Sequence, residues 1–326
     1  MKNDVDMSVY LEDSDRYADL VNVFGKLTKR KVGAEDVRPY ETKLLYRIER
    51  QFRRMRFSKQ RDTVRRVIFG VNFVVTEVEL QEKIDYSYPL RDMGYTYGEY
   101  EQQARKIRKM VRRSKAGLSP GEYLYGFMKK SRLRPTVIFL LYFGVEEWDG
   151  PTCIHDMLDF TDVPEEIKRM VQNHYIHLID VHRMPEEELE LFRTDVGKVL
   201  RLIKNSENKN GLKNVVENDP YYSNMDKDAY LVAANYIQAE ALLDYEKYEN
   251  EGGYDMCTGL KEWLEDERIE GRAEGRAEGR AEERIRLLVD LVNDKVINVT
   301  EAAKRMEVTE EQFRKIMEEE LKERRK

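Results

Sequence analysis

The 326-residue chain has little cysteine and no long apolar run. Its two cysteines, Cys153 and Cys257, lie far apart, which excludes a disulfide framework and a thiolate metal cluster. No apolar segment approaches the roughly 20 residues that cross a bilayer. The N-terminus also lacks the apolar stretch of a signal peptide. We therefore expect a cytoplasmic protein without a membrane segment.

Basic and acidic residues are unevenly distributed. Up to Pro135 the sequence holds 12 Lys and 18 Arg against 9 Asp and 10 Glu, a net charge of +11, so the remainder carries −17 within the total of −6. Charged residues make up 37% of the chain, well above the usual quarter, which favours long surface helices. A basic segment joined to an acidic one indicates that the basic segment, here residues 1–135, contacts nucleic acid. Helix faces exposed to solvent would produce the same composition.

The apolar periodicity predicts an α/β core. Residues 64–69 and 71–80 are rich in Val, Ile and Phe and break near Gly70, which predicts a hairpin of two strands. The continuous apolar run 135–144 predicts a strand buried on both faces. The other predicted elements are helices at 14–27 (capped by Ser14 or Asp15), 40–60 and 98–114, a short helix after the turn in "LSPGEYL", and a strand at 175–181.

The pattern becomes helical after Pro185. The segment "EGRAEGRAEGRAEE" has a four-residue period that places Glu and Arg on opposite sides of a helix, and its glycines weaken that helix by roughly 1 kcal/mol each. It is a marginal exposed helix or a low-complexity spacer, and its charge stripes could pair with a second copy in a homodimer through the C-terminal helices. The tail resembles a helix-turn-helix with Thr300 and Thr309 as capping residues, in a packing or a DNA-reading role. We predict a core at 1–185, a helical extension at 186–265, a repeat helix at 266–285 and a small helical hairpin at 286–326.

The stretch "VVTEVELQ" places polar groups on one face of an apolar strand. Glu77, Glu79 and Gln81 alternate with Val78 and Leu80, and alternate residues of a strand share a face. A hairpin that turns at Gly70 brings Asp62, at the start of the first strand, beside Glu79. Two carboxylates there could hold Mg²⁺, with Gln81 orienting water or phosphate. The alternative is that these carboxylates form ion pairs with neighbouring arginines, namely Arg61, Arg65 and Arg66.

Basic side chains dominate the end of the predicted helix 98–114. Seven lie between positions 105 and 115, nearly without acidic neighbours, which favours phosphate contacts over a merely solvated surface. The residues expected to contact the DNA backbone are Arg105, Arg108, Lys109 and Arg112. By contrast, His174, His177 and His182 do not share one face of a strand, so a zinc site is not expected.

Longer strings carry a family resemblance. The order "RD…EVELQ…IDYSYPLRDMGY", then "GEYLYGFMKKSRLRPTVIFLLYFGVEEWDGP", then "FRTDVGKVLRLI" resembles the PD-(D/E)XK nuclease family transposases, relatives of the recombination-promoting nucleases. The resemblance spans roughly Asp15 to Trp263, and the repeated "EGRA" is also frequent in that family. It implies a restriction-endonuclease-like core, with a mixed sheet flanked by helices, an α-helical C-terminal extension and metal-dependent DNA cleavage.

The resemblance also assigns roles to residues. The acidic pair of the family falls on Asp62 and Glu79, and the Gln that replaces the usual Lys of the superfamily falls on Gln81. The helix motif with Tyr and Gln falls on Tyr100 and Gln103. Leu80 stands where the family usually has Asn, and its side chain is expected to face away from the site. The implied function is a Mg²⁺-dependent DNA endonuclease; the alternative is a non-catalytic DNA-binding or assembly protein descended from one.

Overall fold

The chain divides into two units, Met1–Gly259 and Leu260–Lys326. This computed structural model describes residues 7–40, 43–50, 53–60, 62–70, 72–114, 117–237 and 239–323. Among these residues no helix is both long and apolar enough to cross a bilayer.

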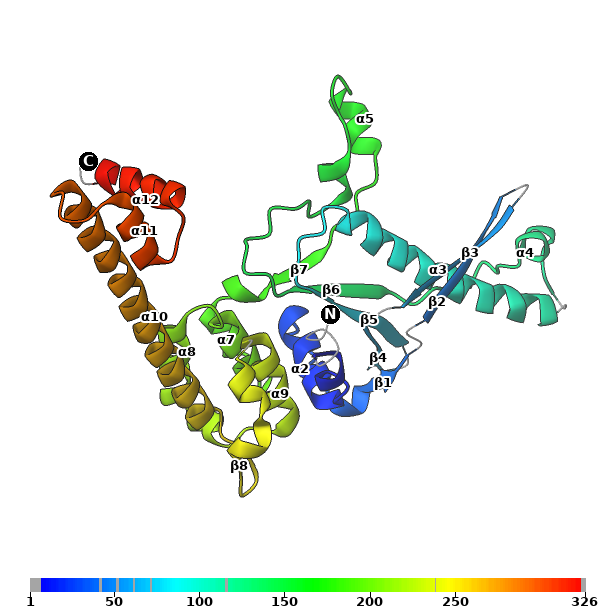
Figure 1. The fold of residues 1–326 in the computed structure, drawn as a ribbon. Coiled ribbons are helices and arrows are strands. Elements are labelled where there is room, and N and C mark those ends of the chain that lie inside the picture. The colour runs from blue at the N-terminus through cyan, green and yellow to red at the C-terminus, as the bar shows by residue number, and fades with distance from the viewer. Residues whose placement is uncertain are drawn as a thin grey trace. The chain divides into compact units, whose positions relative to one another are not determined.

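A mixed five-stranded sheet lies at the centre of the first unit (Figure 1). In order across the sheet its strands are β1 (Val37–Pro39), β4 (Thr63–Phe69), β5 (Asn72–Gln81), β6 (Thr136–Tyr142) and β7 (His177–Asp180). β4 and β5 form the predicted antiparallel hairpin, whereas β5, β6 and β7 run parallel. The hairpin turns at Gly70, whose φ of +66° is a left-handed conformation that glycine adopts without strain. The predicted α/β class is therefore confirmed.

Helices cover both faces of this sheet. α2 (Ser14–Phe24) packs on one face, where the rings of Phe24 and Phe139 lie 6.2 Å apart. α3 (Tyr88–Ser114) lies on the other face, where Tyr88 packs with Leu140. β6 is consequently buried on both sides, as its apolar run predicts.

Helix starts differ from the sequence prediction at two places. Asp13, rather than Ser14 or Asp15, caps α2, because its carboxylate accepts the backbone N–H groups of residues 15 and 16 at 2.9 Å. α3 begins at Tyr88 instead of near Gly98. Pro89 falls within its first turn, where the missing N–H leaves no hydrogen bond unmade.

The helix predicted over residues 40–60 is wrong. The chain there forms an antiparallel hairpin of β2 (Lys43–Arg50) and β3 (Arg53–Gln60). Leu44, Leu45 and Ile48 fit a helical period, but the register pairs Tyr46 with Phe57 and Ile48 with Met55. This pairing depends on a partner strand, which the local periodicity of residues 40–60 does not show.

The helices after Pro185 belong to the same unit as the sheet. The buried carboxylate of Asp19 in α2 accepts the backbone N–H groups of Arg193 and Thr194 at 2.7 Å, which joins α2 to the start of this region. The remaining elements of the unit are η1 (Ala34–Asp36), α4 (Pro120–Tyr125), η2 (Ile154–Met157), α5 (Glu165–Met170), η3 (Val181–Arg183), α6 (Glu186–Leu189), α7 (Val196–Lys204), α8 (Lys209–Glu217), η4 (Pro220–Ser223), α9 (Lys227–Ile237), η5 (Glu240–Leu243), η6 (Tyr245–Tyr248), β8 (Glu249–Asn250) and β9 (Gly253–Tyr254).

The repeat segment lies in one long helix, α10 (Met256–Asn293), which runs across the boundary between the units. A side-chain carbon added at Gly271, Gly275 or Gly279 would meet nothing within 4 Å. Arg272 and Arg276 are exposed. The sequence left open whether this segment is an exposed helix or a low-complexity spacer, and the structure shows an exposed helix.

The second unit ends in α11 (Val299–Met306) and α12 (Glu310–Glu323). The predicted capping role of Thr309 is confirmed, since Thr309 and Gln312 exchange hydrogen bonds between side chain and backbone in a capping box. Asn298, not Thr300, caps α11. α12 contains six Glu against two Lys and one Arg, and this negative charge would repel phosphates. The unit is held together by a small core of Leu288, Val289, Ala302, Ala303 and Phe313.

Arg16 generates a prediction about stability. Its guanidinium binds Asp195 with two hydrogen bonds of 2.8 Å and Asp226 with one of 2.9 Å, and the Arg16 and Asp195 side chains are each 13% exposed. Arg16→Ala leaves Asp195 largely buried without its cation, so we expect the free energy of unfolding to fall by about 2–4 kcal/mol. Arg193→Ala is the control, because this 56% exposed side chain lies 3.7 Å from Asp19 and should contribute below about 1 kcal/mol. Urea denaturation of both variants tests this, and equal losses would contradict it.

Candidate functional site

Asp62 and Glu79 lie side by side at the open end of the β4–β5 hairpin. The backbone N–H of Asp62 donates to Glu79 Oε1 at 3.4 Å, and the N–H of Leu80 donates to Asp62 Oδ2 at 3.0 Å. The register pairs Thr63, the first residue of β4, with Val78, so Asp62, which directly precedes β4, stands opposite Glu79. The structure therefore brings the two carboxyl groups to the same edge, as the hairpin predicts. We call Asp62 and Glu79 the carboxylate pair.

A third carboxyl group adjoins this pair. Glu77 is fully buried and Glu79 is 4% exposed, both on the face of β5 that α3 covers. The two carboxyl groups lie close enough for each to disfavour ionisation of the other. Burial, the neighbouring Glu77 and then Asp62 raise the pKa of Glu79 well above its usual range. Burial also raises the pKa of Asp62, although this residue keeps some exposed surface. The cluster thus favours a bound proton or another cation.

Arg91 supplies positive charge to the cluster, and sequence reasoning missed it. Its guanidinium donates to Gln81 Oε1 at 2.7 Å, pairs with Asp85 at 3.1 Å and lies 4.7 Å from the centre of the Tyr88 ring. Its charge counteracts burial and lowers the pKa of both Asp62 and Glu79. The signal that could have revealed it is the start of α3. Had the helix been predicted to begin at Tyr88, Arg91 would have fallen in its first turn, facing the sheet.

The arginines expected as alternative partners lie elsewhere. Arg65 donates to the carbonyl of Val64 and lies over the Tyr17 ring, on the α2 side. Arg66 lies over the Phe73 ring at 5.6 Å. Arg61 falls outside the described residues.

Gln103 is not part of the cluster. Its amide nitrogen donates to Glu99 and to the carbonyl of Arg134, and its amide oxygen accepts the N–H of Arg134 at 2.7 Å. The Tyr100 hydroxyl accepts the N–H of Thr136 at 3.4 Å. Thr136 pairs with Val75, four residues before Glu79, or roughly 13 Å along the strand. Both helix-motif residues therefore hold the entry into β6, and a direct contact of Gln103 with the carboxylate pair is not seen.

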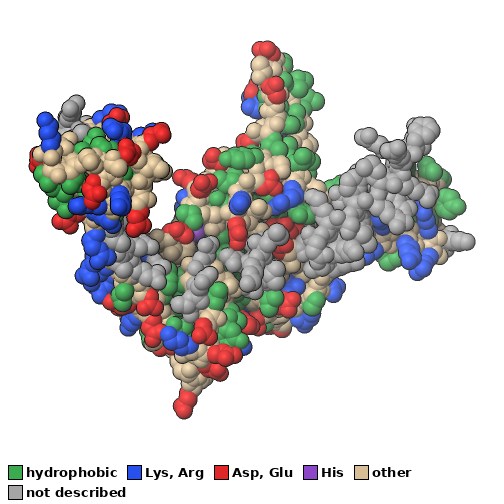
Figure 2. Space-filling model, in the orientation of Figure 1, with side chains coloured by type: hydrophobic (Ala, Val, Ile, Leu, Met, Phe, Trp, Pro, Cys, Tyr) green, Lys and Arg blue, Asp and Glu red, His purple; other side chains and the backbone are tan. Residues whose placement is uncertain are grey.

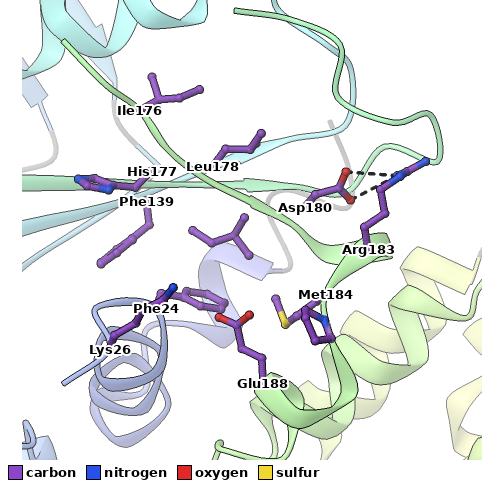
Figure 3. Close-up of a pocket in the computed structure, with 12 residues that line it drawn as sticks. Phe24, Lys26, Phe139, Ile176, His177, Leu178, Asp180, Arg183, Met184 and Glu188 are labelled. Carbon is purple, nitrogen blue, oxygen red and sulfur yellow. Dashed lines mark hydrogen bonds and ion pairs between the residues drawn. The ribbon is translucent and has the colours of Figure 1, made fainter. Parts of the chain in front are cut away.

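The histidines have separate partners. His174 Nε2 contacts Asp92, whereas His182 Nδ1 lies 3.2 Å from the carbonyl of Lys204. His177 lines a pocket of about 450 Å³ on the α2 side of the sheet, beside Phe139 and Phe24 (Figure 3). Glu79 pairs in register with Leu140, which points to the opposite face, so this pocket is separate from the carboxylate pair. Within the described part of the chain, no three His, Cys, Asp or Glu side chains gather as a metal site.

The predicted DNA-contacting residues lie on one stripe of α3. They line a shallow groove of about 340 Å³, and their spacing of three and four residues is that of a single helix face. Glu101 pairs with the two innermost members, at 3.2 and 3.1 Å. We call this set the basic stripe; its members are Arg105, Arg108, Lys109, Arg112 and Arg113.

A comparison with known families identifies part of the chain. Residues 121–224 match the model of the family described as "Putative transposase, YhgA-like", one of the PD-(D/E)XK nuclease-like transposases. The resemblance drawn from the sequence is thus confirmed, with the matched segment running from α4 to η4. Asp62, Glu79, Gln81 and the basic stripe precede this segment. No curated protein and no solved structure matches the chain.

The carboxylate pair has the donor chemistry of a Mg²⁺ site. Mg²⁺ binds oxygen ligands, keeps several waters and commonly uses only one or two carboxylates. Asp62 and Glu79 supply two carboxylates, and burial raises the pKa of each, so a bound cation would favour their ionised forms. The residues therefore fit a divalent cation, although Arg91 already offsets part of the charge.

Arg91→Gln tests the electrostatic balance of the cluster. Without this cation the pKa values of Asp62 and Glu79 should rise further, so ionising them would cost more. For an acid whose folded pKa is raised, stability is greatest at low pH and falls as pH rises through the folded pKa. We expect the variant's thermal midpoint to drop more at pH 8 than at pH 5. Arg65→Gln, which faces the α2 side, should lose the same amount at both values. Equal losses at both pH values for Arg91→Gln would refute this role.

Proposed function

We propose that the chain is a metal-dependent DNA nuclease with a restriction-endonuclease-like core. The observation that carries the proposal is the carboxylate pair, which lies at the end of the β4–β5 hairpin beside Arg91, with Glu79 buried and Asp62 partly open to solvent. The mixed sheet between helices and the transposase-family match in residues 121–224 support it. We further propose Mg²⁺ as the cation, with Asp62 and Glu79 as its protein ligands.

Each residue of the cluster has a role in this proposal. Bound Mg²⁺ would activate water and stabilise charge on the phosphate. The N–H of Leu80 holds Asp62 in place, and Glu79, whose pKa is raised, would have to be ionised to become a ligand. Gln81 is oriented by Arg91 through its amide oxygen, which leaves its amide nitrogen to donate to water or phosphate. Arg91 adds positive charge at the same edge.

A non-catalytic DNA-binding protein is the second candidate, and Arg91 favours it. This residue compensates part of the negative charge without any metal, as a purely structural ion-pair network would. The two candidates differ in what Glu79 does, so substitution of this residue separates them.

Glu79→Gln should abolish cleavage but keep the fold. The change retains size and removes the charge that would anchor Mg²⁺, so plasmid nicking in Mg²⁺ should fall by orders of magnitude while DNA binding remains. In EDTA at pH 8 the thermal midpoint should rise, because the cost of ionising a buried Glu79 disappears; below its usual pKa of about 4.5 the gain should vanish. Mg²⁺ should raise the midpoint of the wild type but not of the variant.

The matched control is Glu188→Gln, in the pocket on the other side of the sheet. It should nick DNA and respond to Mg²⁺ like the wild type. A Glu79→Gln protein that nicks normally but melts early would instead identify Glu79 as a structural ion-pair partner, and would remove the nuclease assignment from this site.

The basic stripe should add a salt-dependent contribution to DNA binding. Each phosphate contact contributes about 0.9 to the slope of log affinity against log salt for duplex DNA. Replacing Arg105, Arg108 and Arg112 with Gln should therefore flatten the slope by about 2–3, as measured by fluorescence anisotropy in EDTA. A control with three other surface cations of the unit replaced by Gln should keep the slope; these are Arg169, Arg193 and Lys213. An unchanged slope in the first variant would show that the stripe is only a solvated face.

A further inference from the structure

Three large side chains project into solvent from α4. Tyr123, Leu124 and Tyr125 are 72%, 70% and 72% exposed. Contiguous exposed apolar side chains of this size commonly mark a binding surface. Figure 2 shows hydrophobic and basic side chains beside one another at the end of the unit where Figure 1 places α4.

The chain holds α4 in a fixed position. Ser119 and Glu122 form a capping box at its start, and the Glu122 carboxylate also accepts the N–H of Lys129 at 3.0 Å. At its end Gly126 has a φ of +63°, and a side-chain carbon there would lie 3.3 Å from Cγ of Arg108. The exposed tyrosines are therefore presented on a rigid turn that lies directly against the basic stripe.

We propose that α4 and the basic stripe form a binding site for an unpaired DNA strand, with bases stacked on Tyr123 and Tyr125 and phosphates in the groove. The proposal rests on the proposed function, for which it names the form of the substrate. Exposed aromatic rings beside a cationic groove are the two elements by which proteins bind single strands without reading their sequence. In a duplex the base faces are already stacked, so the rings would have nothing to contact.

The distance to the carboxylate pair suits this arrangement. Arg105 follows Arg91 by 14 positions on the same continuous helix, on the order of 20 Å at 1.5 Å per residue. A separation of this length corresponds to a span of several nucleotides of an unpaired strand. Site sizes of about 4–16 nucleotides are usual for single-strand grooves.

The experiment compares single-stranded and duplex DNA on the full chain. Affinity for a fluorescein-labelled oligothymidine and for a hairpin duplex of equal nucleotide number is measured by anisotropy in EDTA, where no cleavage occurs. Tyr123→Ala with Tyr125→Ala should weaken single-strand binding by about 10-fold or more and leave the salt slope unchanged. Duplex binding should be affected little. Tyr123→Phe with Tyr125→Phe keeps the rings and should bind as the wild type does.

Tyr175→Ala is the matched control, because this tyrosine is 67% exposed on a different part of the unit. Normal oligothymidine binding by the double alanine variant, or tighter wild-type binding to the duplex than to the single strand, would overturn the proposal. So would a double alanine variant that loses binding to phosphatidylserine vesicles but not to DNA. A failed nicking assay leaves this outcome unaffected, since binding is measured without metal.

Discussion

The structure around the candidate site depends on how carboxyl groups are accommodated beneath α3. Glu77, Glu79, Asp92 and Glu99 are all nearly inaccessible to solvent between this helix and the sheet. A buried carboxylate costs several kcal/mol unless it is protonated, paired or bound to a cation. These groups are accommodated in different ways. Asp92 contacts the His174 ring, and Glu99 accepts hydrogen bonds from Tyr40 and Gln103. For Glu79, burial and the neighbouring Glu77 raise the pKa, which favours its neutral form. On the opposite face, beneath α2, the ring of Phe24 packs against those of Phe139 and Phe192.

The alternation of polar and apolar residues predicted those residues of the site whose positions depend only on the β4–β5 hairpin. Alternation along β5 placed Glu77, Glu79 and Gln81 on one face, and the turn at Gly70 was enough to bring Asp62 opposite Glu79. Both inferences need only the geometry of a strand and of a hairpin. Contacts between residues far apart in the sequence could not be predicted in the same way. Arg91 enters the site because α3 starts at Tyr88 and crosses the sheet, which depends on tertiary packing rather than on the sequence near Glu79.

The errors elsewhere have the same origin. The apolar residues of β2 fit a helix as well as a strand, and only their pairing with β3 distinguishes the two. Gln103, which the family motif associates with the site, instead forms two hydrogen bonds with the backbone of Arg134, about four turns along α3 from its start. A sequence motif indicates that a residue is found together with a site. It does not give the distance between the residue and the site, which here is set by the course of α3.

The proposed metal site can be judged by the charge of the cluster. Asp62, Glu77 and Glu79 would carry −3 if all three were ionised, against +1 from Arg91. Asp85 takes part of that positive charge. Under the proposed function, Mg²⁺ would supply the missing +2 and leave the cluster neutral, and release of protons on metal binding is the usual coupling at such sites. A further guanidinium would supply only +1 and would not activate water. The burial that makes ionised carboxylates costly in the metal-free protein is therefore the feature that the proposed Mg²⁺ site would relieve.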